Sequence, residues 1–223
     1  MLIEGVLLDG SGTIVDDLST CYNATRLSLT DLGYRSVTLE EYLENVNPIQ
    51  KLYGLVGLYS KNHMSRQPEL YGNHFLEMRE SVRTFDDVMP GVKKLSDSGI
   101  VIGVVTQQLK ALILHELQKS GLSHYIPEEY VVAFEDSVEH KPSPMPVSLG
   151  LGRIDVSASA AVLCGDTIQD IQAGQRAGTR TVAISRPNGS YHSKEKLSSA
   201  GPHKVVSDFS EFVAFIEELN KSR

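Results

Sequence analysis

The sequence predicts a doubly wound α/β fold with a mostly parallel β-sheet and a small helical domain inserted after the first strand. Short apolar runs rich in branched residues, typical of strands buried on both faces, recur along most of the chain. Segments with helical spacing separate these runs, and such alternation predicts parallel strands joined by right-handed crossovers. Residues 17–87 interrupt the alternation because they contain few strand signals. We therefore expect a core domain of residues 1–16 and 88–223 and a helical domain of residues 17–87.

The first predicted strand, residues 2–8, ends at Asp9, and Gly10 and Gly12 then flank Ser11. The glycines allow a sharp turn and a close approach of a ligand to the main chain. Open α/β sheets bind ligands at the carboxyl ends of their strands, which is where Asp9 would lie. A strand followed by an ordinary surface turn explains this stretch alone equally well.

Residues 18–82 predict four helices. Apolar residues recur at helical spacing over residues 18–32, and Gly33 can end that helix. Thr38 with Glu41 forms a capping-box start, and Pro48 and Pro68 stand where first-turn prolines begin helices. Several side chains could face a ligand, although an ordinary surface or packing role is favoured for each one: Tyr53, Tyr59, Lys61, His63, Arg66 and His74.

The rest of the chain alternates between strands and helices. The predicted strands cover residues 100–106, 130–134, 160–164, 180–185 and 203–206. Three predicted helices begin at Met89–Gly91, at Leu109 and after Lys141. A fourth follows the strand of residues 160–164 and ends at Ala177, and a closing helix covers residues 209–219. Glycines at positions 99, 121 and 178 can end three of them.

Polar residues follow several of these elements. Thr106 ends the strand of residues 100–106, as Asp9 ends the first strand. Lys141 stands between a polar loop and a proline-stiffened helix start, and is therefore a better candidate than the usual solvated lysine. Asp166 and Asp170 are four residues apart, which places both on one face of a helix start. They can cap that helix, or they can form half of a magnesium site.

Composition limits the classes of partner. The net charge of −7 gives no basic surface for nucleic acid or an anionic membrane, so an acidic protein that handles phosphates needs a metal ion or local basic groups. No apolar run approaches the roughly 18 residues that span a bilayer. The N-terminal residues lack the pattern of a signal peptide, and Cys21 and Cys164 lack metal-site spacing. These features lead us to expect a cytoplasmic protein with reduced thiols.

Four motifs in this order resemble those of the haloacid dehalogenase superfamily: residues 7–13, 104–106, 141–142 and 165–170. Each motif is weak alone, but four in order make a specific signal. The resemblance covers nearly the whole chain and is greatest to the phosphoglycolate phosphatase and β-phosphoglucomutase branch. It implies a Rossmann-like core, a helical cap, and hydrolysis of a small phosphorylated metabolite.

The resemblance also implies a role for each matching residue. Asp9 would attack phosphorus and become an aspartyl phosphate. Mg²⁺ would be held by Asp9, by the backbone carbonyl of Ser11 and by Asp166, with Asp170 near. The phosphoryl group would be bound by the side chains of Thr106 and Lys141 and by backbone amides at Gly10 and Gln107.

One position departs from the family pattern. Phosphatases of the superfamily carry an acid–base aspartate two residues after the nucleophile, where this chain has Ser11. A serine hydroxyl does not ionise near neutral pH, and the general acid–base help it cannot provide is worth roughly 10²–10⁴-fold. The chain could still cleave substrates with good leaving groups, or use another group such as Thr13 or Asp16 through water.

Two other functions remain open. The protein could bind a phosphorylated ligand with little or no turnover, or it could hydrolyse C–P bonds as phosphonatases do, with Lys51 or Lys61 as the cap lysine. Retention of the candidate nucleophile with its metal partners favours a hydrolase. The junctions Asp16–Leu18 and Thr84–Val88 are the predicted hinges of a closing cap.

Overall fold

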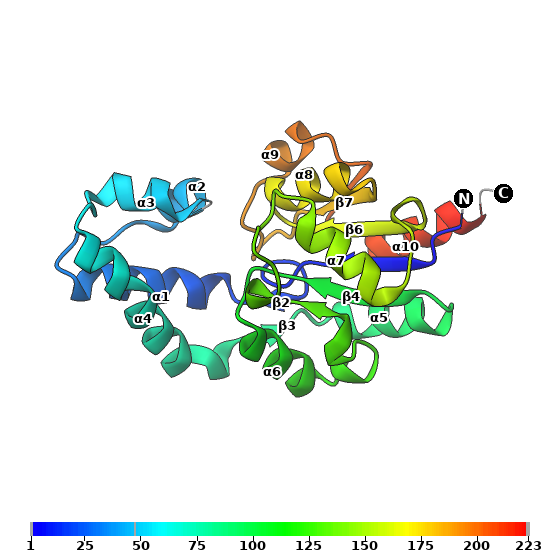
Figure 1. The fold of residues 1–223 in the computed structure, drawn as a ribbon, viewed down its shortest axis with the longest axis horizontal. Coiled ribbons are helices and arrows are strands. Elements are labelled where there is room, and N and C mark those ends of the chain that lie inside the picture. The colour runs from blue at the N-terminus through cyan, green and yellow to red at the C-terminus, as the bar shows by residue number, and fades with distance from the viewer. Residues whose placement is uncertain (1, 47, 222–223) are drawn as a thin grey trace. The chain divides into compact units, whose positions relative to one another are not determined.

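The structure is a computed structural model that describes residues 2–46 and 48–221 (Figure 1). Its contacts divide the chain into two compact units. The α/β unit comprises residues 1–16 and 83–223, and the helical unit comprises residues 17–82. The predicted insert extends further, to residue 87, and its role as a cap stays a prediction.

A six-stranded parallel sheet forms the centre of the α/β unit and confirms the predicted fold class. The strand order is β5-β4-β1-β6-β7-β8. Predicted strand 130–134 is shorter than expected, because 3₁₀ turns take up the residues on both sides of β5. The strands are β1 (Gly5–Leu8), β4 (Val101–Val105), β5 (Val131–Val132), β6 (Ala161–Gly165), β7 (Arg180–Ile184) and β8 (Lys204–Val206).

Two sets of helices accompany the sheet (Figure 1). One set contains α5 (Val88–Asp97) and α10 (Phe209–Lys221), which pack on each other and on the strands. The other contains α7 (Met145–Ile154), α8 (Ile168–Ala177) and α9 (Lys194–Ser199), of which α8 contacts both neighbours. Helix α6 (Lys110–Ser120) ends at Gly121 and α8 ends at Gly178, both in the left-handed conformation that glycine adopts without strain.

The strand register brings three strand ends to one level of the sheet. Leu8 pairs with Val104 on one side and with Cys164 on the other. The residues that follow, Asp9, Val105 and Gly165, therefore lie side by side at the carboxyl ends of these strands. Because β1 lies between strands that come later in the chain, this edge is the switch point at which doubly wound sheets bind ligands.

A short antiparallel ribbon lies where the chain leaves and re-enters the α/β unit. It pairs β2 (Val15–Asp16) with β3 (Arg83–Thr84). Strands of two residues carry no periodic signal, so the sequence did not predict this ribbon.

The helical unit contains α1 (Leu18–Asp31), α2 (Leu39–Asn45), α3 (Ile49–Val56) and α4 (Lys61–Met78). Thr38 and Glu41 form the predicted capping box of α2. The prediction for Pro68 is wrong, because α4 begins after its cap Ser60 and contains the proline in its interior. An interior proline costs about 3 kcal/mol, so packing of the buried face of α4, which includes Gln67 and Phe75, must outweigh it.

Short 3₁₀ helices complete the described elements: η1 (Arg79–Ser81), η2 (Leu122–His124), η3 (Glu128–Tyr130), η4 (Phe134–Asp136) and η5 (Ala158–Ala160). Within residues 2–46 and 48–221, no helix has both the length and the apolar character required to cross a membrane.

Candidate active site

The loop after β1 is a compact turn that carries Asp9 and Ser11. The amide of Asp9 donates to the carbonyl oxygen of Cys164 at 2.9 Å, which fixes the residue beside β6. The carbonyl oxygen of Gly10 accepts from three later amides in the same turn: Thr13 at 3.3 Å, Ile14 at 2.9 Å and Val15 at 2.9 Å. The turn is thus a small rigid body attached to the end of β1.

Gly12 brings this turn against the end of β6. Its φ of +75° lies in the left-handed region, and a Cβ atom there would lie 2.2 Å from Oδ2 of Asp166. Only glycine fits such a contact. The turn that carries Asp9 and Ser11 therefore lies directly against Asp166.

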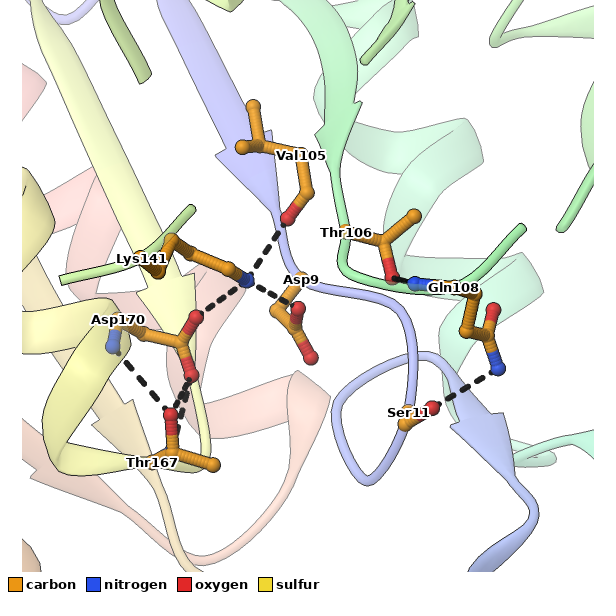
Figure 2. A network of polar contacts seen from close by, with 8 residues as sticks. All are labelled: Asp9, Ser11, Val105, Thr106, Gln108, Lys141, Thr167 and Asp170. Carbon is orange, nitrogen blue, oxygen red and sulfur yellow. Dashed lines mark hydrogen bonds and ion pairs between the residues drawn. The ribbon is translucent and has the colours of Figure 1, made fainter. Parts of the chain in front are cut away.

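Lys141 joins the loop to two further elements (Figure 2). Its Nζ donates to Oδ1 of Asp9, to Oδ1 of Asp170 at 2.5 Å and to the carbonyl oxygen of Val105 at 3.0 Å. All the ionic partners are buried, with Asp9 and Lys141 each 6% exposed. One lysine thus bridges the ends of β1 and β4 and the first turn of α8.

Burial sets the charges of this cluster. Removal from water raises the pKa of Asp9 to about 7, because burial and the nearby Asp170 charge outweigh the attraction of Lys141. Although burial acts in the opposite direction, the carboxylates of Asp170 and Asp9 hold the pKa of Lys141 above its ordinary value. Lys141 is therefore a fixed cation, whereas burial makes Asp9 harder to ionise than an ordinary aspartate.

Asp170 caps α8, which is one of the two roles that the sequence suggested for it, and its role at a metal site stays a prediction. Thr167 is the N-cap of α8, and Oδ2 of Asp170 accepts from its amide at 3.0 Å in a capping box. The other oxygen, Oδ1, faces Lys141. Asp166 precedes the cap rather than lying on the helix, and its Oδ2 accepts from the amide of Tyr191 at 2.6 Å.

Asp9, Asp166 and Asp170 fit a magnesium ion. One carboxylate oxygen from each lies within 4.8 Å of the others, and all three residues are buried. Lys141 pairs with two of these carboxylates, Asp9 and Asp170, so full ionisation of this pair against one ammonium group would leave a surplus of negative charge. Mg²⁺ prefers hard oxygen ligands of this kind, and a divalent cation would balance the surplus.

Ser11 has a partner that the sequence did not reveal. The side-chain amide of Gln108 donates to Oγ of Ser11 at 2.8 Å, and the backbone amide of Gln108 donates to Oγ1 of Thr106 at 3.1 Å. Figure 2 shows these three side chains on the other side of Asp9 from Lys141 and Asp170. No local pattern could have identified Gln108, because it lies 97 positions from Ser11.

The two backbone candidates lie in the same loops. Gly10 is buried, and a Cβ atom there would lie 2.7 Å from Oγ1 of Thr106, so a side chain at this position would displace the threonine. Gln107 is exposed at the end of β4. The roles of the site residues as a set stay a prediction.

Several ligand-facing candidates in the helical unit have partners within that same unit. Tyr53 is buried and donates to Gln67 at 2.7 Å, which is a packing role. His63 bonds Tyr34 at 3.0 Å, and His74 bonds Asp31 at 2.7 Å. The other four candidates are exposed: Lys51, Tyr59, Lys61 and Arg66.

Known proteins resemble this chain over nearly its full length. A family model described as "Haloacid dehalogenase-like hydrolase" matches residues 6–184. Pyrophosphatase PpaX of Bacillus pumilus is 26% identical over 215 residues, which cover 96% of this chain and 96% of the relative. Pyrophosphatase PpaX of Bacillus thuringiensis is 27% identical over 233 residues, which cover 100% of each.

Solved structures share the fold. A predicted phosphoglycolate phosphatase from Haemophilus somnus matches with a TM-score of 0.83 at 18% identity, over 96% of this chain and 97% of that chain. A hydrolase from Pseudomonas syringae matches with a TM-score of 0.81 at 15% identity, over 97% of this chain and 99% of that chain. At these identities the likeness concerns the fold.

Proposed function

This chain belongs to the haloacid dehalogenase-like hydrolase family, and on that premise we propose that it hydrolyses a small phosphorylated metabolite with Mg²⁺ and an aspartyl phosphate at Asp9. The observation that carries this proposal is the buried cluster of three carboxylates at the carboxyl edge of the sheet, two of which share one lysine. A purely structural ion pair needs no such surplus of negative charge. A site that binds both a cation and a phosphoryl group does need surplus negative charge, because the charge attracts the cation.

The metal would be held by Asp9 and Asp166, with Asp170 beside it, and by the carbonyl of Ser11. When bound, Mg²⁺ reduces the repulsion between the Asp9 carboxylate and the anionic phosphoryl group. Lys141 orients the Asp9 carboxylate and adds fixed positive charge to the site. The Thr106 hydroxyl, which already accepts from Gln108, keeps its own proton to donate to a phosphoryl oxygen.

The reaction then has two steps. The Asp9 carboxylate attacks phosphorus, the bond to the leaving oxygen breaks, and its electron pair leaves with that oxygen. Water next attacks the phosphorus of the aspartyl phosphate, and the P–O bond to Asp9 breaks with its electron pair returning to the carboxylate. The product leaves as dihydrogen phosphate, which carries both protons of the water.

Ser11 weakens proton transfer in both steps. Its hydroxyl accepts from Gln108 and does not ionise near neutral pH, so it neither protonates the leaving oxygen nor activates water efficiently. Substrates whose leaving group departs as a stable anion suffer least from this loss. The relatives named pyrophosphatase agree with such a substrate, because phosphate is a leaving group of this kind.

The buried thiols of Cys21 and Cys164 agree with a reducing, cytoplasmic location, which we include in the proposal. A phosphorylated ligand bound without turnover is the second candidate, and the replacement of an ionisable group by Ser11 favours it.

Phosphate release from an aryl phosphate, with and without Mg²⁺, tests the proposal. We expect Mg²⁺-dependent release by the native protein, a loss of roughly 10⁴-fold or more in Asp9→Asn, and faster release in Ser11→Asp. The matched control is Ser11→Asn, which has the shape of aspartate without its proton chemistry and should not be faster. A native protein that is inert but becomes active as Ser11→Asp would favour the binding function. If phosphate release is unchanged in Asp9→Asn, the assignment of Asp9 as the nucleophile is wrong.

A further inference from the structure

Arg186, outside the four motifs, is a buried cation close to the turn that carries Asp9. It follows β7, and its side chain is 7% exposed. Its guanidinium group lies 3.8 Å above the ring centroid of Phe85. A cation buried this far must be matched by partners that fix its position.

The guanidinium group holds two separate segments at once. Nη1 pairs with Oδ2 of Asp87 at 3.0 Å, and Nη2 donates to the carbonyl oxygen of Thr13 at 3.0 Å. Oδ2 of Asp87 also accepts from the amide of Phe209 at 2.7 Å, which anchors the pair to the start of α10. Arg186 therefore ties the turn after β1 to the frame of the α/β unit.

The same short segment also holds Asp166. The amide of Tyr191 donates to Oδ2 of Asp166 at 2.6 Å, and the amide of Arg186 donates to the hydroxyl of Ser190 at 2.8 Å, which keeps the segment compact. Thr13 belongs to the rigid turn gathered on the carbonyl of Gly10, and Gly12 of that turn lies against Asp166. Both halves of the candidate metal centre are thus attached to residues 186–191.

We propose that residues 186–191 form a positioning element of the metal centre, with Arg186 as the positioning residue that sets the separation between the Asp9 turn and Asp166. The inference rests on the proposed metal-dependent function. An octahedral Mg²⁺ site tolerates little displacement of its ligands. Loosening the turn should therefore lower the affinity for Mg²⁺ before it unfolds the protein. Arginine suits this task because its planar fork reaches two acceptors in fixed directions, which a lysine does not.

Calorimetric titration with Mg²⁺ tests this on the full-length native protein, Arg186→Met, Arg186→Lys and the control Arg180→Met. Arg180 begins β7, at the opposite end of that strand from Arg186, and donates to the carbonyl oxygen of Ser159 at 3.2 Å. We expect Arg186→Met to bind Mg²⁺ about 10–100-fold more weakly and Arg186→Lys about 10-fold more weakly, with Arg180→Met unchanged. Excess Mg²⁺ should restore most of the turnover of Arg186→Lys, which a general loss of folding would not allow.

Native Mg²⁺ affinity in folded Arg186→Met would overturn the inference while leaving the proposed function intact. If Arg186→Met does not fold, native affinity in Arg186→Lys overturns it in the same way. A native protein that binds no Mg²⁺ would instead overturn the metal-dependent function, and this inference with it.

Discussion

Each unit of this protein has a buried side chain that bridges three elements, and the two bridges differ in charge. In the α/β unit, Lys141 joins Asp9 after β1, Val105 of β4 and Asp170 of α8. In the helical unit, Gln67 of α4 accepts from Tyr53 of α3 and donates to Ser28 of α1 at 3.0 Å. Both bridges are buried and both connect elements that are distant in sequence.

The neutral bridge is complete in itself, whereas the ionic one is not. The Gln67 amide uses its oxygen and nitrogen on two hydroxyls, and the Ser28 hydroxyl donates onward to the carbonyl of Thr25 at 2.9 Å. Such a network needs nothing more to be stable. In the Lys141 bridge, burial and the neighbouring Asp170 charge raise the pKa of Asp9 despite the lysine. We infer that the neutral bridge serves folding, and that the ionic bridge is kept for a cation and an anionic substrate.

Breaking the ionic bridge should have the larger effect on stability. Lys141→Met leaves the buried carboxylates of Asp9 and Asp170 without their cation and should lower the free energy of unfolding by about 3–5 kcal/mol, measured by urea unfolding without Mg²⁺. The double variant Lys141→Met/Asp9→Asn should be more stable than Lys141→Met alone, because it removes one of the uncompensated charges. A loss below about 1 kcal/mol in Lys141→Met would mean that the lysine does not balance the cluster.

Breaking the neutral bridge should cost less and should leave the chemistry alone. Gln67→Leu leaves the Tyr53 hydroxyl without its acceptor and removes the donor to Ser28, for an expected loss of about 1–3 kcal/mol in the free energy of unfolding. Adding Tyr53→Phe should recover part of this loss. Mg²⁺ affinity should stay native. If Gln67→Leu weakens Mg²⁺ binding as Lys141→Met does, the division of roles between the two bridges is wrong.

A partly exposed pair in the helical unit should have the smallest effect. The hydrogen bond to Asp31 raises the pKa of His74, so the pair stabilises the folded state fully below the unfolded pKa of about 6.5. The contribution is lost as the pH rises through the higher folded pKa. His74→Gln should therefore lower stability by about 0.5 kcal/mol at pH 5 and have no effect at pH 9. A deficit that is equal at both pH values would show that packing, not charge, is lost.

Local signals made much of the candidate site predictable. Asp9 and Thr106 each end an apolar run, and Lys141 and Asp170 each stand near a helix start. Parallel strands bring such ends to one edge, so the local patterns sufficed to collect them. The left-handed glycines after α6 and α8 similarly allowed the helix ends to be located.

Long-range contacts and tertiary packing were beyond the reach of the sequence. Gln108 meets Ser11 across 97 positions and Arg186 meets Thr13 across 173, and neither pair leaves a periodic or motif signal. Pro68 was misplaced because packing of α4 outweighs the local preference of proline for a first turn. The cap role of the helical unit and its hinges also depend on long-range contacts, and they stay predictions.

Trapping the phosphorylated protein tests the central claim most directly. The native protein, Asp9→Asn and Ser11→Asp would be mixed with acetyl phosphate and Mg²⁺, quenched in acid and examined by intact-mass and peptide mass spectrometry. Because Ser11 activates water poorly, we predict that one phosphoryl group accumulates on Asp9 of the native protein. The phosphorylated fraction should be smaller in Ser11→Asp, and Asp9→Asn should carry no phosphoryl group. Mg²⁺-dependent phosphate release with no adduct on Asp9, or an adduct that persists in Asp9→Asn, would contradict the account.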